Sequence, residues 1–334
     1  MIINIPRIEN LCINTCFTVL FFTTVYYWVT ISFAQNSSYR KTGLFGYACA
    51  LLCLTTHLIL RWSDSGHFPL SNLYESLIFL GWCLILFHIY IETSMKTLLV
   101  GVLTAPAIFC LIAFTDFSLP PDLQKSSPLV PALQSNWLVM HVTVMIASYA
   151  ALLLGCLVGM AYLLFSKVFS DSISTNLAVT TRNASLTNET NLPIEIKNIL
   201  FAANTGATVE VDNIDRKSVN LPNVENSKKV LLFLDNLSYR TIGIGFCFLT
   251  LGILSGAVWA NETWGNYWSW DPKETWAFIT WLTFASYLHS RFIGGWSGSK
   301  PAWIASFGFV IVWICYLGVN LLGQGLHSYG FLAG

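Results

Sequence analysis

Eight apolar runs, each long enough to cross a lipid bilayer, are the feature that most restricts what this chain can fold into. A bilayer-spanning helix needs about 20 predominantly apolar residues, and within lipid only helices or closed barrels satisfy every backbone polar group. The sequence therefore predicts an all-α fold, a polytopic membrane protein with about eight transmembrane helices in a single integral membrane domain over residues 1–334. The runs lie near residues 11–33, 43–60, 73–91, 97–114, 137–165, 241–260, 272–292 and 302–322.

The amino-acid composition excludes several further classes of protein. Of the 334 residues, 54% are hydrophobic and 10% are charged, whereas soluble globular domains carry about 25% charged residues. The formal net charge is zero, so no nucleic-acid partner is indicated. The nine cysteines fall almost entirely within apolar runs, where cysteine behaves as a small hydrophobic residue. Because no C-x-x-C-H motif occurs, the chain is not itself an ordinary c-type cytochrome.

Basic residues predict the orientation in the membrane. Four of the 17 Lys and Arg residues lie on the side of the tryptophan-rich segment 261–276, and the remaining 13 lie on the opposite side. The positive-inside rule then places the tryptophan-rich side outside, in a periplasm or lumen. Residues 166–240 are rich in Asn, Ser and Thr and are predicted to form a flexible inside loop. The four outer cations are Arg7, Arg61, Lys125 and Lys273.

The segment 261–276 contains W-G-N-Y-W-S-W-D-P-K-E-T-W, with four Trp and one Tyr in thirteen residues. Asp271 is suited to cap a helix, Pro272 to its first position and Glu274 to a capping box. An aromatic belt at the membrane interface is the simpler interpretation. A belt needs neither Gly265 nor a capped helix start, whereas a binding platform for a flat apolar ligand would use both. The candidate binding residues are Trp264, Gly265, Trp268, Trp270, Asp271, Pro272 and Trp276.

The same stretch carries a family resemblance. W-G-x-Y-W-x-W-D-P-K-E resembles the "WWD" signature of haem-handling proteins, and the continuation T-W-A-F-I-T-W-L-T-F-A-S-Y-L-H-S-R resembles the CcsA family of cytochrome c biogenesis proteins. The resemblance implies delivery and presentation of haem b for covalent attachment to apocytochromes c. It also implies a CcsB-type second membrane subunit, the two forming a cytochrome c synthase in which the thioether chemistry belongs to haem and thiol.

Three histidines are candidate iron ligands. With eight crossings, His141 begins the fifth helix and His327 follows the eighth, both on the side of segment 261–276. Two such His are suited to be axial ligands of a haem iron, although a single His at such a position is more often an interfacial, hydrogen-bonded His. His289 lies some seventeen residues into the seventh helix, where an ionisable group is costly and usually functional. The resemblance implies that His141 and His327 hold haem outside and that His289 binds it during passage from the inside.

Several alternatives stay open. His88 is a candidate partner for His289, although the resemblance points instead to a His of the second subunit. Arg61, Lys125 and Lys273 are either partners of haem propionates or solvated interfacial charges. Gly252 and Gly256 have the spacing of a close helix contact, or are merely two small residues.

Two other functional classes remain alternatives: a b-type haem electron carrier and a cofactor-free membrane transporter. The carrier is disfavoured because no predicted helix bears two deeply placed His. The resemblance to plastid-encoded proteins favours a plastid thylakoid membrane over a bacterial inner membrane.

Overall fold

The computed structural model describes residues 5–33, 38–125, 135–186 and 222–319, and the regular structure within them is helical. The shorter elements are a single turn, α5 (Pro121–Gln124), and a π-helical turn, η4 (Ile314–Gly318), that continues the last helix. The long helices are α1 (Ile5–Phe33), α2 (Ser38–Ser65), α3 (Leu73–Met95), α4 (Leu99–Phe117), α6 (Asn136–Leu186), α8 (Pro222–Trp264), α9 (Pro272–Phe292) and α10 (Ser299–Trp313).

As far as the structure describes them, the eight predicted apolar runs correspond one to one to the long helices. Within the described residues, seven segments are long and apolar enough to cross a membrane, and they lie in α1, α2, α3, α4, α6, α8 and α10 with η4. The remaining long helix, α9, begins and ends where the sequence predicted. It is not among the seven because its Thr, Ser and charged residues lower its hydropathy. The prediction of an all-α polytopic membrane protein is confirmed.

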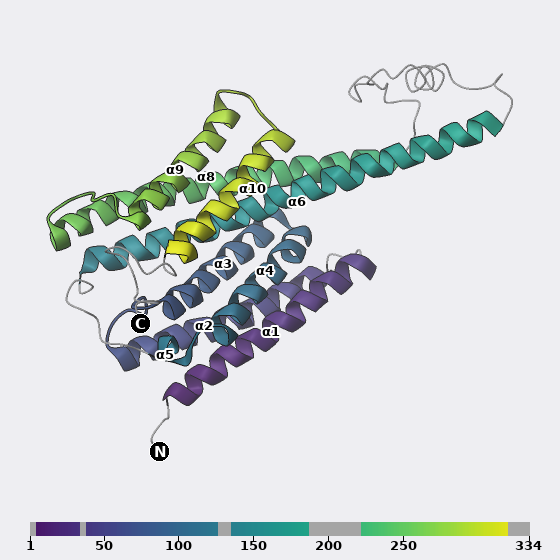
Figure 1. Cartoon of the computed structure of the whole chain (residues 1–334). Coiled ribbons are helices and arrows are strands. Elements are labelled where there is room, and N and C mark those ends of the chain that lie inside the picture. Colours follow the sequence, from purple (N-terminus) through teal and green to yellow (C-terminus); the bar gives the residue numbers. More distant parts are fainter. Residues whose placement is uncertain (1–4, 34–37, 126–134, 187–221, 320–334) are drawn as a thin grey trace.

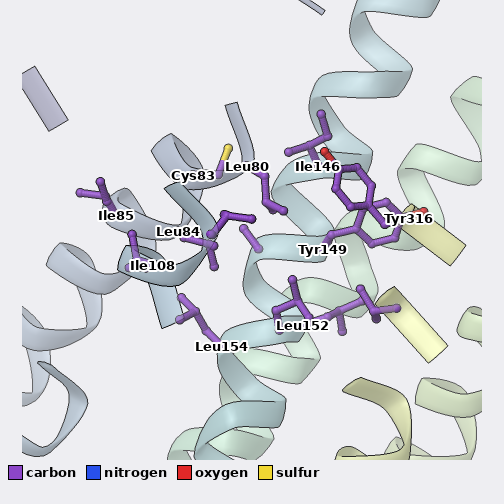
Figure 2. Close-up of a cluster of buried hydrophobic side chains, with 14 of the residues drawn as sticks. Leu80, Cys83, Leu84, Ile85, Ile108, Ile146, Tyr149, Leu152, Leu154 and Tyr316 are labelled. Carbon is purple, nitrogen blue, oxygen red and sulfur yellow. The ribbon is translucent and has the colours of Figure 1, made fainter. Parts of the chain in front are cut away.

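The helices form two groups that meet at α3 and α6 (Figure 1). The first group is α1 to α4, and the second is α6, α8, α9 and α10. A cluster of buried apolar side chains fills the junction: Leu80, Cys83, Leu84 and Ile85 of α3, Ile108 of α4, Ile146, Tyr149, Leu152 and Leu154 of α6, and Tyr316 (Figure 2). The Tyr316 hydroxyl crosses the junction and donates to Ser76 Oγ at 2.9 Å. The two groups are therefore joined by packing that few polar contacts interrupt.

The bundle has two ends (Figure 1). We call one the platform end, where α1, α3, α6 and α9 begin and α2, α4, α8 and η4 end. We call the other the loop end, towards which the long helices α6 and α8 extend. The Trp-rich turn between α8 and α9 and the start of α6 lie together at the platform end, as the alternation of the chain predicted.

The prediction of a loop over residues 166–240 is wrong at both ends of that range. Helix α6 continues to Leu186, and α8 already begins at Pro222; residues 187–221 lie outside the described part. An apolar stripe overlooked among the polar residues explains the early start of α8. Leu234 and Leu237 are buried at helical spacing, and the intervening Asp235 accepts from Arg291 at 2.8 Å. A helix with a buried face and a tertiary ion pair is stable without a high local helix propensity.

Candidate functional site

The turn between α8 and α9 starts from a glycine whose backbone few other residues could adopt. Gly265 follows Trp264, the last residue of α8, and has a φ of +79°. This left-handed region is open to glycine and strained for residues with a Cβ. The chain can therefore leave α8 sharply at this point.

The end of the turn is fixed by the capping box that the sequence predicted. The Asp271 carboxylate accepts the Lys273 N–H at 3.4 Å, and the Glu274 carboxylate accepts the Asp271 N–H at 3.3 Å, with Pro272 as the first helical residue. Glu274 also accepts the Ser269 N–H at 2.8 Å. Because these bonds satisfy N–H groups that a helix start otherwise leaves unpaired, the aromatic turn is joined rigidly to α9.

The aromatic rings of the turn meet edge to face. Trp268 and Trp270 are 5.9 Å apart between centroids at 85°, and Trp268 also contacts Phe278 of α9 at 6.4 Å. Trp270 is 68% exposed and Tyr267 61% exposed. We call residues 264–270 the aromatic platform. Trp276 does not join it, because its side chain packs against the hydrophobic core.

Trp270 combines exposure with a strained backbone. Its φ is +58°, a conformation that costs a non-glycine residue about 1–3 kcal/mol. A tryptophan that only marked the membrane interface would gain nothing from this geometry. The strain therefore favours a platform that presents its rings over a simple aromatic belt.

His141 lies at the platform end and is held in one orientation. Its Nδ1 lies 2.7 Å from the carbonyl oxygen of Gly252 on α8. Since a carbonyl can only accept, Nδ1 carries the proton and the lone pair of the ring resides on Nε2. The ring is also nearly parallel to Trp259, with an interplanar angle of 9° and centroids 6.3 Å apart. Trp259 in turn contacts Trp264 edge to face at 4.8 Å.

These ring contacts connect α6 to the aromatic platform through Trp259, which is 3% exposed. No sequence motif had indicated a role for Trp259. A His that binds a metal through one nitrogen almost always donates from the other to a carbonyl or carboxylate. The hydrogen bond to Gly252 is therefore the arrangement that suits Nε2 to bind a metal.

Two glycines of α8 make room for this arrangement. A Cβ on Gly256 would lie 2.4 Å from Cε1 of His141, and one on Gly252 would lie 2.5 Å from Sδ of Met145. The small-residue spacing in the sequence thus marks a close helix contact, with a histidine placed against it. The signal could have been found by setting the Gly252 and Gly256 pair beside His141, which begins the helix packed on α8.

His289 lies nearer the end of its helix than the sequence predicted. Helix α9 ends at Phe292, so His289 falls in its last turn, near the loop end. The prediction that it lies well inside the membrane is wrong, because its distance from the helix start is nearly the whole helix length. Its side chain is exposed and no partner for it is found among the described residues. The buried face of α9 is made by Ala277, Thr280, Phe284, Tyr287 and Leu288.

The structure brings His141 and the aromatic platform together but not every candidate. His327 lies outside the described residues. His88 is 0% exposed inside the group α1–α4, so it does not face His289. Arg61 is 4% exposed and its Nε donates to Glu75 Oε1 at 2.7 Å. Neither interpretation of Arg61 from the sequence holds, because this buried ion pair leaves no role as a solvated charge or as a propionate partner.

Comparison with known proteins identifies the family of the chain. The family model described as "Cytochrome C assembly protein" matches residues 70–327. The "Cytochrome c biogenesis protein CcsA" of Chlorella vulgaris is 66% identical over 333 residues, covering 99% of both chains. The proteins of the same name from Microcystis aeruginosa and Pyropia yezoensis are 47% and 45% identical, each covering at least 98% of this chain and 99% of their own.

The solved structure "Cytochrome c Heme Lyase CcmF" shares the fold, with a TM-score of 0.56 at 14% identity. The match covers 96% of this chain and 46% of that one, so this chain spans about half of its length. The identities with the CcsA proteins and the extent of the family match reach far beyond the tryptophan signature. The chain therefore belongs to the cytochrome c assembly protein family, as a CcsA-type member.

Proposed function

We propose that this protein delivers haem b and presents it on the aromatic platform for covalent attachment to apocytochromes c. The family places the chain in cytochrome c biogenesis. In the proposal, His141 and His327 bind the haem iron from its two sides, while Trp264, Trp268 and Trp270 support the ring. The haem is a substrate here, and its vinyl groups react with the thiols of the apocytochrome.

The observation that carries the proposal is the hydrogen bond from His141 Nδ1 to the Gly252 carbonyl, at 2.7 Å. It sets the tautomer that leaves the lone pair on Nε2, and Trp259 keeps the ring parallel to its own plane. A ligand held in this way needs little reorganisation when iron binds. The protein thus contributes the position of the ring and control of the iron, rather than bond-forming groups.

His289 suits the proposed uptake of haem from the loop end. The exposed imidazole stands on a face of α9 with the apolar residues Phe278 and Leu282, which are 39% and 44% exposed. A polar ring on the surface of a membrane bundle is costly unless another protein or a ligand covers it. We infer that a CcsB-type second membrane subunit covers this face, with haem bound between the two proteins during its passage.

We propose that the membrane is the thylakoid of a plastid. The relatives from Chlorella vulgaris and Pyropia yezoensis are algal, which supports a plastid over a bacterial cell. In a thylakoid the platform end would face the lumen.

The test is replacement of His141 by Gly in the full-length protein, co-expressed with its second subunit and a reporter apocytochrome c. We expect loss of the bis-histidine visible spectrum and of haem-stained cytochrome, and partial recovery of both with imidazole, which can enter the vacated position. Replacing His67 by Gly is the matched control, since His67 also lies at the platform end, where its Nδ1 lies 3.2 Å from the Phe68 carbonyl oxygen, and is not a proposed ligand. Normal maturation and an unchanged spectrum in His141→Gly would refute the outer-site proposal.

A further inference from the structure

A second polar centre lies inside the group α1–α4, apart from the aromatic platform. His88 and Glu92 are both 0% exposed and stand one turn apart on α3. His88 Nε2 lies 2.9 Å from Glu92 Oε2. All four helices of the group reach this pair, because Tyr27 of α1, Tyr47 of α2 and Thr104 of α4 surround it.

The contacts of the pair are short and specific. The Tyr27 hydroxyl donates to Glu92 Oε2 at 2.7 Å, and Thr104 Oγ1 lies 2.7 Å from His88 Nδ1. The Tyr47 ring covers the imidazole at a centroid distance of 3.8 Å. Glu92 Oε1 and His88 Nε2 are both buried without a hydrogen-bond partner among the described residues, because the 2.9 Å approach of Nε2 to Oε2 lacks hydrogen-bond geometry. An ionised carboxylate would leave this oxygen uncompensated, whereas a proton on the carboxyl group would remove the charge and lower that cost.

A purely structural role explains the pair poorly. His88 and Glu92 belong to the same helix, so their mutual attraction fastens no helix to another. Burying two charges costs several kcal/mol per ion, and apolar replacements of buried pairs are often neutral or stabilising. Within a membrane bundle such groups are commonly part of proton relays or substrate sites. The Tyr27 and Tyr47 rings pack against the imidazole, and both members of the pair are 0% exposed. A proton is the ligand small enough to bind there.

Charge balance limits the pair to one added proton, because the nearby Arg40 guanidinium offsets an ionised Glu92 and opposes any net positive charge on the pair. With a neutral imidazole and an ionised carboxylate, the pair carries one negative charge, and one added proton on either group makes it neutral overall. A second added proton would leave one positive charge without a counter-charge. The remaining neighbours are Tyr27, Tyr47 and Thr104, and Arg40 of α2, whose guanidinium donates to the Glu92 backbone carbonyl at 3.2 Å. Helix α6 faces this part of the group through apolar residues such as Leu154, which points toward Leu84 and Ile108 (Figure 2).

We propose that His88 and Glu92 form a binding site for one exchangeable proton, reached from the loop end. Glu92 lies in the last turn of α3, three residues before its final residue Met95. The partly exposed Arg40 stands beside that turn, so only a short path separates the pair from solvent. Taking up or losing the proton changes which groups donate and accept around Glu92. The protonation state therefore acts on the packing of α1, α2 and α4 against α3.

The experiment is infrared difference spectroscopy of the purified full-length protein between acidic and alkaline buffers, in H2O and in D2O. We expect a carboxylic-acid C=O band that responds to pH and shifts in D2O. Glu92→Gln should abolish the band, and Tyr27→Phe, which removes one hydrogen bond but keeps the acid, should shift its frequency. Glu9→Gln is the matched control, because Glu9 is another buried acid of the same group, 8% exposed, and its loss should leave the band in place.

Two results would overturn the proposal. One is a spectrum that Glu92→Gln and Tyr27→Phe leave unchanged, which would assign the titrating acid elsewhere. The other is a band that responds neither to pH nor to D2O, which would show a sealed structural pair. If Glu92→Gln does not accumulate, the Tyr27→Phe spectrum decides, because that variant keeps both members of the pair. The readout contains no haem, so the result is independent of the proposed haem function.

Discussion

Replacing Gly256 by Ala should displace His141 without removing any proposed ligand. An added Cβ would lie 2.4 Å from Cε1 and 2.5 Å from Nδ1 of His141, whereas atoms in contact sit about 3.5–4.0 Å apart. The imidazole must therefore retreat by about 1 Å. Its hydrogen bond to the Gly252 carbonyl, now 2.7 Å, then lengthens past the range in which such bonds are effective.

The expected cost to stability is modest. Overpacking costs about 1–3 kcal/mol, and loss of the hydrogen bond adds about 0.5–1.5 kcal/mol. The higher helix propensity of Ala offsets about 1 kcal/mol of this. A net loss of about 0.5–3.5 kcal/mol leaves a membrane bundle folded. A binding group misplaced by 1 Å, in contrast, costs function on the order of 100-fold, so we expect protein that accumulates but matures little cytochrome c.

The assay measures haem per chain from the visible spectrum and cytochrome c from haem staining, with protein level determined in parallel. Gly243→Ala is the matched control, because it lies on the same helix and a Cβ there would meet no atom within 4 Å. We expect this control to keep full activity and to gain slightly in stability. If Gly256→Ala bound haem and matured cytochrome c as well as Gly243→Ala, the role assigned to the His141 orientation would be refuted.

Two further predictions concern the supports of the site and of the bundle. Asp271→Ala removes the cap of α9 and should cost about 0.5–2 kcal/mol; we expect normal protein levels with less haem per chain, and full haem occupancy would contradict the role of the cap. Arg61→Leu leaves the buried Glu75 carboxylate without its ion-pair partner at 2.7 Å and should cost about 3–5 kcal/mol, seen as a lower thermal unfolding temperature in detergent. Arg7→Leu, at an exposed position of α1, should stay within about 0.5 kcal/mol, and equal effects of the two Arg substitutions would contradict the buried ion pair.

The features that the sequence predicted correctly depend on local chemistry. The cap of α9 depends on residues close together in the sequence, Asp271, Pro272 and Glu274, and it forms as predicted. The apolar runs became helices because lipid allows the backbone few other solutions. The shared end of His141 and the aromatic platform followed from counting crossings, which needs no knowledge of how the helices pack.

The features that it missed depend on contacts between distant segments. His141 and Gly252 are 111 positions apart, and no local pattern pairs them. Arg61 was predicted to lie at the interface because it directly follows the second apolar run, but Glu75 and Glu9 reach it from two other helices. The extension of α8 below residue 241 was missed because Leu234 and Leu237 are embedded among polar residues. Their burial becomes evident only when the helices that cover them are known.

Polar residues of α3 are buried in the first helix group, whereas polar residues of α9 in the second group are exposed. This difference indicates where a second subunit would bind. Helix α3 carries Glu75, His88 and Glu92, all at 0% exposure. The helices α1, α2 and α4 supply their partners, and α1 and α2 precede the family match that begins at residue 70. Without that cover, three ionisable groups of α3 would face lipid, at considerable cost.

Among the described residues, nothing covers the outer face of helix α9 in this way. It is the least apolar of the eight long helices by the spanning criterion, and Ser286 and His289 are exposed there beside Phe278 and Leu282. If the chain met lipid on this face, selection for stability would favour apolar residues at both polar positions. Because α1 and α2 already show how this fold shields a polar helix, the exposed face of α9 is where a covering subunit is expected. Crosslinking from Ser286→Cys to the second subunit, but not from Cys110 on the exposed surface of α4, would support that assignment, and equal crosslinking from both positions would refute it.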